Sequence, residues 1–183
     1  FALSDNGKGI STTIQLSASP VNGNPGYITY PDGSKIFLTA SSQSITLTQP
    51  GTYTVGESFT EFKFTHSDST LDASLTSAGV WENAMLNVPD FGNELFKNVH
   101  NLSGVPTGLK LKSLDKTFEG TSPTTDIGVI DTSLVTSAVG TFLNSVVEVT
   151  DNIDIWDVSN VTNMSRMFEG AAFYNGDISV WDV

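Results

Sequence analysis

The sequence predicts a mainly β protein with short helices, in which a small β-sandwich is followed by a solenoid of repeated coils. Two observations lead to this prediction: short runs of alternating polar and apolar residues before about residue 58, and a repeat of about 25 residues after it. Only 38% of the 183 residues are hydrophobic and 15% are charged, which is low for one compact core. Aromatic and β-branched residues are nevertheless frequent, so we expect a folded chain.

Residues 1–58 are predicted to form a β-sandwich domain of immunoglobulin-like type. Polar and apolar residues alternate in several short runs, which is the pattern of half-buried strands. Turn-forming residues, as in Pro31-Asp32-Gly33-Ser34, separate these runs. Five or six strands at such spacing are typical of a small sandwich. The predicted strands are Thr12–Ala18, Tyr27–Tyr30, Lys35–Thr39, Ser44–Thr48 and Thr52–Val55.

Residues 59–183 are predicted to form a leucine-rich-repeat-like solenoid. The clearest copies of the repeat are the segments 153–158 and 178–183, in which Trp156 and Trp181 are 25 residues apart. A period in the low-to-mid twenties is that of leucine-rich-repeat solenoids. Degenerate earlier copies keep a phenylalanine at intervals of 22, 24 and 26 residues. These are Phe96, Phe118, Phe142 and Phe168.

The spacing within one repeat predicts a short strand and then a short helix. Ile153–Trp156 alternates and is predicted to be a strand of a parallel sheet. Val161, Met164, Met167 and Phe168 recur at helical spacing, so they are predicted to turn one apolar face inward. One such unit cannot bury its own apolar face, and stacking of the units would form the core.

The repeat resembles the BspA-like repeat of bacterial surface proteins, also described as a 25- or 26-residue lipoprotein repeat. Trp156–Met164, Met167-Phe168, Ala171 and Phe173 follow its pattern, W-D-V-S-N-V-T-N-M-x-x-M-F-x-x-A-x-x-F-N. The resemblance is strong over 153–183, fair over 80–150 and weak over 1–50.

Residues 110–145 depart from the pattern of this family. Ala138 and Val139 stand where Met and small polar residues are usual. The coils in this part of the chain are therefore expected to be irregular.

The resemblance implies a right-handed solenoid on a surface-exposed or secreted protein. It implies a role in adhesion or another protein interaction, with a protein or glycan on another surface as the partner, and it brings no catalytic residues. Such repeats also occur in phage and large-virus proteins. The alternative is therefore a self-assembling structural subunit of a virion, a phage appendage or an extracellular filament.

Charge and composition exclude several classes of function. The formal net charge is −12, and Arg166 is the only basic residue after Lys116. Such a surface repels phosphate backbones, so we expect no nucleic-acid partner. No apolar run is long enough to span a membrane, so we expect no membrane insertion of this segment. The chain has no cysteine, which excludes disulfides, thiolate zinc sites and cysteine nucleophiles.

No constellation in the sequence predicts an enzyme. His66 and His100 are the only histidines, and no familiar metal or nucleophile motif accompanies them. The candidate binding residues are Trp156 and Trp181, as an aromatic platform for a ligand such as a glycan. The alternative for both indoles is packing in the core of the coils.

Asp157 and Asp182 recur at one repeat position, together with Asp131. Recurrence favours a structural role, such as capping a turn in each coil. Calcium binding by stacked carboxylates is the alternative, and otherwise no cofactor is expected. The loop Asp68–Asp72 is a weaker candidate for a calcium site.

The end of the sequence leads to one more expectation. Val183 directly follows the strand predicted for a new coil, whose closing Val-x-x-Met-x-x-Met-Phe segment is not in the sequence. An open solenoid end needs a cap or a neighbour. We therefore expect further coils after Val183, or another chain, to cover this end.

Overall fold

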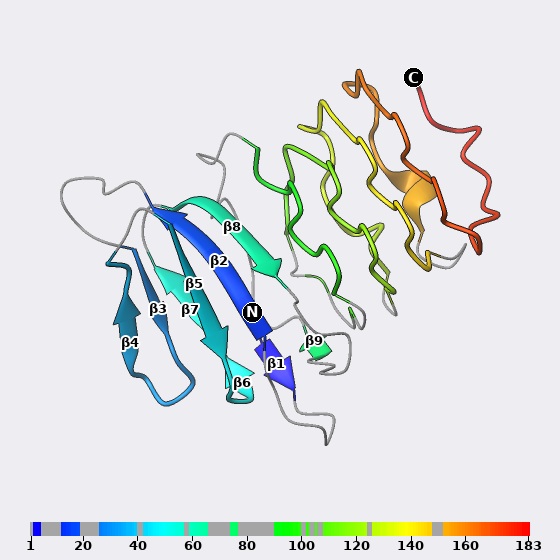
Figure 1. Ribbon diagram of the computed structural model, residues 1–183. Helices are drawn as coiled ribbons and strands as arrows, with labels where there is room; N and C mark the ends of the chain where they lie inside the picture. The colour runs from blue at the N-terminus through cyan, green and yellow to red at the C-terminus, as the bar shows by residue number, and fades with distance from the viewer. Residues whose placement is uncertain are drawn as a thin grey trace.

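The computed structural model describes residues 2–4, 12–18, 26–39, 42–56, 59–65, 74–76, 90–99, 102, 105, 108–123, 126–147 and 152–183. These residues are mainly β, with strands toward one end of the molecule and stacked coils of chain toward the other (Figure 1). None of their helices is long and apolar enough to cross a membrane. His66, His100 and the loop Asp68–Asp72 lie outside the described residues.

The described strands pair in three antiparallel sheets, in the orders β6-β1-β9, β5-β2-β8 and β4-β3-β7. Their bounds are Ala2–Ser4 (β1), Thr12–Ala18 (β2), Tyr27–Thr29 (β3), Lys35–Phe37 (β4), Ser42–Leu47 (β5), Gly51–Thr52 (β6), Thr54–Gly56 (β7), Phe59–Thr65 (β8) and Ser74–Thr76 (β9).

The strands predicted from alternation are confirmed within a few residues. In β2 the apolar positions Ile14 and Leu16 are fully buried, as a half-buried strand requires. Ile14 lies opposite Ile45 of β5, so apolar residues meet across the sheet. β3 and β4 form the predicted hairpin.

The strand predicted at Thr52–Val55 is divided at Tyr53 into β6 and β7. The Tyr53 side chain is buried, and its hydroxyl donates to the carbonyl of Gln49 at 2.7 Å. Its ring packs against Tyr30, with centroids 5.3 Å apart. Burial and this hydrogen bond tie the residue to the preceding turn, and the two halves of the segment pair in different sheets.

Two further strands, β8 and β9, were not among those predicted. β8 begins at Phe59, the first residue assigned to the repeats, and pairs with β2 along its length. The sheet that contains β2 therefore includes chain up to Thr65. The division of the chain at residue 58 into two domains stays a prediction.

From residue 90 onward, successive coils run parallel and join through regularly spaced backbone bonds (Figure 1). The amide of Phe96 donates to the carbonyl of Thr117 at 3.0 Å, and the amide of Phe118 donates to Thr141 at 3.0 Å. The amide of Phe142 donates to Met167 at 2.8 Å. The intervening amides mostly bond three residues back within their own coil, so each coil is a run of turns.

The short helix predicted over 161–168 is wrong, because this segment consists of turns. Its apolar residues do face the core as predicted, and Met167 is 4% exposed. A helix cannot form because Arg166 and Gly170 have positive φ, 59° and 75°, outside the right-handed helical region. Earlier coils repeat this pair of positions on either side of their phenylalanine. The pairs are Glu94 and Asn98, Lys116 and Gly120, and Gly140 and Asn144.

The strand predicted at Ile153–Trp156 is also wrong, because Ile153–Ile155 forms a 3₁₀ helix (η2). Ile153 and Trp156 are buried, whereas Ile155 is 67% exposed. Burial thus recurs every three residues, which is the 3₁₀ period. Asn152, in a left-handed conformation, precedes the turn.

The coils between residues 110 and 145 are regular, which overturns the expectation of irregularity. Ala138 is fully buried, and its amide donates to the carbonyl of Asn163 at 2.8 Å. The hydrogen bonds of this coil have the spacing of those in its neighbours. A small residue therefore fits a position where the family pattern has Met.

A column of aromatic rings forms the core of the coils. Phe96, Phe118, Phe142 and Phe168 stack with centroids 5.5–5.6 Å apart. Trp156 packs beside Phe118 and Phe142, at 6.2 and 5.6 Å. The column runs across the coils and reaches the last coil at Phe168.

Candidate functional site

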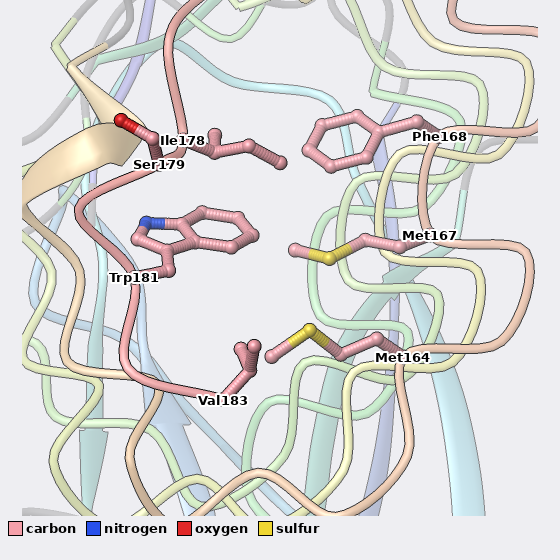
Figure 2. Close-up of a pocket in the computed structure, with 7 residues that line it drawn as sticks. All are labelled: Met164, Met167, Phe168, Ile178, Ser179, Trp181 and Val183. Atoms are coloured by element: carbon pink, nitrogen blue, oxygen red, sulfur yellow. The ribbon is translucent and has the colours of Figure 1, made fainter.

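The last two segments of the described chain enclose an apolar groove at the end of the aromatic column. The groove has a volume of about 430 Å³, within the range of small ligand sites. Figure 2 shows side chains of two segments facing each other across it. The lining residues are Met164, Met167, Phe168, Ile178, Ser179, Trp181 and Val183.

The fold places one wall of the groove through the turns of the 163–170 coil. Left-handed Arg166 and Gly170 flank Phe168 and hold its ring on the column, 5.5 Å from Phe142. Tyr174 covers another part of the Phe168 ring, at 4.9 Å. Phe168 remains partly exposed, unlike Phe142, because no described coil stacks on its outer side.

The other wall is the segment that ends at Val183. Trp181 packs beside Phe168 with centroids 6.2 Å apart and is partly exposed. Its indole N–H donates to the carbonyl of Ile153 at 3.1 Å. Val183 is 88% exposed, so an apolar side chain stands at the mouth of the groove.

The two tryptophans predicted as binding residues occupy different environments. Trp156 is only 3% exposed, and its indole N–H donates to the carbonyl of Ile127 at 3.1 Å. Trp181 repeats this hydrogen bond one coil later, with Ile153 as the acceptor. Trp156 therefore packs inside the coils, and Trp181 is the one whose ring lines a groove.

The two aspartates predicted as binding residues lie outside the groove lining. Asp157 is exposed, and its Oδ1 accepts hydrogen bonds from the amide of Ser159 at 3.1 Å and from the Ser159 hydroxyl at 2.6 Å. These bonds lower the pKa of the Asp157 carboxyl. Asp182 is exposed next to Trp181.

The predicted turn-capping role is confirmed for Asp157 and Asp131. Asp131 accepts the same two bonds from Ser133, at 3.0 and 2.6 Å. Lys110 of the preceding coil also contacts the Asp131 carboxylate at 2.7 Å. Burial raises the Asp131 pKa, but the hydrogen bonds from Lys110 and Ser133 outweigh it and leave the pKa below its usual value. Because these oxygens already hold turns in place, a cation would compete with the fold for them.

The described residues include no group of three or more His, Cys, Asp or Glu side chains that could hold a metal ion. Among the groove residues, the only hydroxyl is that of Ser179, and no histidine or carboxylate lines the groove. The chemistry that the groove offers is apolar contact.

Sequence reasoning missed a row of backbone donors beside the groove. In the preceding coil, the amides of Ala138, Gly140, Phe142 and Asn144 donate to carbonyls of the 163–169 segment at 2.8–2.9 Å. The equivalent amides of the last full coil accept no partner within the described part of the chain. They belong to Met164, Arg166, Phe168 and Gly170. Only the alternate hydrogen-bonding pattern of the coils identifies this row, and that pattern depends on backbone conformations that the sequence does not reveal.

Comparison with protein families gives one match. Residues 110–183, less than half of the chain, match the model of a family described as Mycoplasma protein of unknown function, DUF285. The match spans the coils from Lys110 to the groove and excludes the strands. No curated protein and no solved structure is significantly similar to the chain.

Proposed function

We propose that this protein is a non-enzymatic, surface-exposed module for adhesion or another protein interaction. In this proposal an immunoglobulin-like β-sandwich carries a leucine-rich-repeat-like solenoid of the BspA-like type. The regular stacking of the coils on one aromatic column supports the solenoid. The repeated W-D-V segments support the relationship to the surface-protein repeats.

The single observation that carries a binding role is the groove at the end of the column. Single exposed apolar residues are common on protein surfaces, but a contiguous apolar groove marks a site of interaction. Here Phe168, Trp181 and Val183 gather apolar surface in one place. The partner we propose is a protein or glycan on another surface, with Trp181 in the contact and Asp182 at its rim.

The proposed location is outside the cell or on its surface, with the surface of a virion as the alternative. The net charge of −12 favours a soluble, well-separated chain. It also disfavours contact with anionic lipid and nucleic acid.

A binding screen tests this proposal. The labelled chain is applied to arrays of glycans and of cell-surface proteins, with Trp181→Ala as a groove variant. We expect saturable binding by the parent, weaker binding by the variant, and no chemical change in the ligand. Turnover of any array ligand would contradict the non-enzymatic role.

Sedimentation of the same preparation separates the two non-enzymatic functions. A monomer is expected for an adhesion module. A defined polymer would overturn that role in favour of a structural subunit of a virion, appendage or filament.

A further inference from the structure

The end of the coils differs from the edge of an ordinary sheet. A sheet edge exposes both N–H and C=O groups. The outer side of the 163–170 coil instead presents four amides in a row, those of Met164, Arg166, Phe168 and Gly170, at every second residue. We call this set the donor row. The carbonyls at the intervening residues, from Asn163 to Glu169, already accept bonds from the preceding coil.

The described interfaces between coils show what satisfies such a row. The amides of residues 114, 116, 118 and 120 donate to the carbonyls of residues 137, 139, 141 and 143 at 2.9–3.0 Å. The amides of residues 138, 140, 142 and 144 repeat the arrangement one coil later. In each case a ring of the acceptor segment, Phe142 or Phe168, stacks on the column. A partner that continues this interface must therefore supply alternate carbonyls and a central aromatic ring.

We propose that the donor row and the groove together bind a turn-forming polypeptide segment of a partner chain, which adds one more coil to the stack. The donor row would hold the partner's backbone, and the groove formed by Phe168, Trp181 and Val183 would receive its aromatic side chain. This mode resembles strand addition at a sheet edge, where main-chain bonds supply affinity and side-chain pockets supply specificity. The inference rests on the proposed function and names the chemistry of the partner.

A twofold dimer through this end does not fit the same requirements. Such a dimer would bring identical surfaces together. Two donor rows would then face each other with no acceptors between them, and unpaired buried amides are costly. Each copy also carries a net charge of −12, which opposes close contact.

The test uses the whole chain and a synthetic peptide copy of its own repeat, residues 153–177, with both ends blocked. Amide spectra of the isotope-labelled chain are recorded during the titration. We expect saturable changes and slowed hydrogen exchange at the four amides of the donor row. A scrambled peptide of the same composition should leave those amides unchanged.

A second peptide tests the backbone bonds alone. Replacing the amide bonds after residues 165 and 167 by esters weakens those two carbonyls as acceptors and keeps every side chain. We expect about fivefold or more weaker binding, because two hydrogen bonds to the donor row are weakened. Equal binding of the ester and the parent peptide would overturn the role of the donor row.

A matched pair of protein variants tests the groove. Val183 lines the groove and is 88% exposed, whereas Val180 is 69% exposed and does not line it. Val183→Asp should weaken peptide binding about tenfold, because it places a carboxylate where an apolar side chain must dock. Val180→Asp should change binding less than twofold, within the usual range for exposed sites. Both variants should melt like the parent.

The outcomes also separate this inference from the proposed function. Failure of the peptide to bind, with array binding intact, would refute the donor-row partner and leave the interaction module standing. Array binding that survives Val183→Asp would have the same meaning. Loss of both kinds of binding in the parent chain would overturn both proposals.

Discussion

The strands before residue 66 and the coils after residue 90 satisfy their backbone hydrogen bonds differently. β2 bonds to two neighbours of unrelated sequence, so that Ile14 lies opposite Ile45 on one side and Phe64 on the other. Each described coil bonds instead to a degenerate copy of itself, with one row of donors facing one row of acceptors. The coil stack therefore has a direction, and its last described coil exposes donors only.

The two regions also build their cores differently. The described core of the strands mixes aliphatic residues such as Ile14, Leu16 and Leu47 with Tyr53. The core of the coils repeats one residue type, and each internal phenylalanine touches the equivalent ring before and after it. A change at one ring is therefore felt in two neighbouring coils.

The largest effect is expected from removing a central ring of the column. Phe118 is fully buried between Phe96 and Phe142. Phe118→Ala should lower the free energy of unfolding by about 3–5 kcal/mol, because it leaves a cavity inside the stack. Urea denaturation measures the loss, and hydrogen exchange should place it in the coils.

A phenylalanine of the strands is the control for this change. Phe37 on β4 is 51% exposed and contacts Tyr27 at 5.6 Å between centroids. Phe37→Ala should cost under about 1 kcal/mol, as expected of an exposed position. Equal costs for the two variants would break the distinction between the two cores.

A smaller effect is expected from glycines at left-handed positions. Gly120 has φ 64°, and an added Cβ would lie 2.5 Å from the Asn98 Oδ1 of the neighbouring coil. Gly33, in the hairpin turn, has φ 85° with open space around it. Both alanine variants carry the backbone cost of about 1–2 kcal/mol, but only Gly120→Ala also has to displace a neighbour.

Thermal melting of the two glycine variants compares the regions directly. We expect Gly120→Ala to lower the melting temperature more than Gly33→Ala does. The reverse order would mean that the coils yield to an added methyl group more easily than the hairpin turn.

The sequence predicted the strands better than the coils, for a physical reason. Alternation reports burial on one face of a sheet, and it located β2 and the β3–β4 hairpin. In the coils, the spacing of Val161, Met164 and Met167 reported burial correctly but suggested a helix. Left-handed Arg166 changes the backbone while keeping those side chains inward, and an arginine gives no signal of positive φ.

The candidate site was only partly predictable for the same reason. The repeat identified Trp156 and Trp181, but burial decided that only Trp181 lines a groove. The recurring aspartates were recognised as turn formers because Asp and Ser hydrogen-bond locally. The donor row could not be found, since it is a property of backbone geometry.

Asp131 offers a smaller, pH-dependent test of contact between coils. Its pKa is lowered in the folded chain below the ordinary value of 3.8, so its contribution is present above that value and is lost as the pH falls through the folded pKa. Asp131→Asn should therefore flatten the loss of stability below about pH 4. The effect should be at most about 1 kcal/mol, because the carboxylate is well exposed.

Salt separates this contact from a local one in the strands. Asp32 is bonded to Ser34 within its own turn, whereas Asp131 also pairs with Lys110 of the preceding coil. About 1 M salt should shrink the effect of Asp131→Asn and leave that of Asp32→Asn almost unchanged. Equal salt responses would mean that the Lys110 contact adds nothing to the coil interface.

The smallest effect is expected from metal removal. The Oδ1 atoms of Asp131 and Asp157 already accept two hydrogen bonds each, and the described residues hold no group of three carboxylates or histidines. A chelator should therefore shift the melting temperature by less than about 1 °C, because a cation bound to the folded state would raise it measurably. Asp157→Asn is the matched variant, since it keeps an oxygen that can cap the turn and removes the charge that calcium needs. A chelator-induced drop that calcium restores in the parent, and not in Asp157→Asn, would contradict this prediction. The recurring aspartates would then be cation ligands, and the coils would depend on a metal in a way that the strands do not.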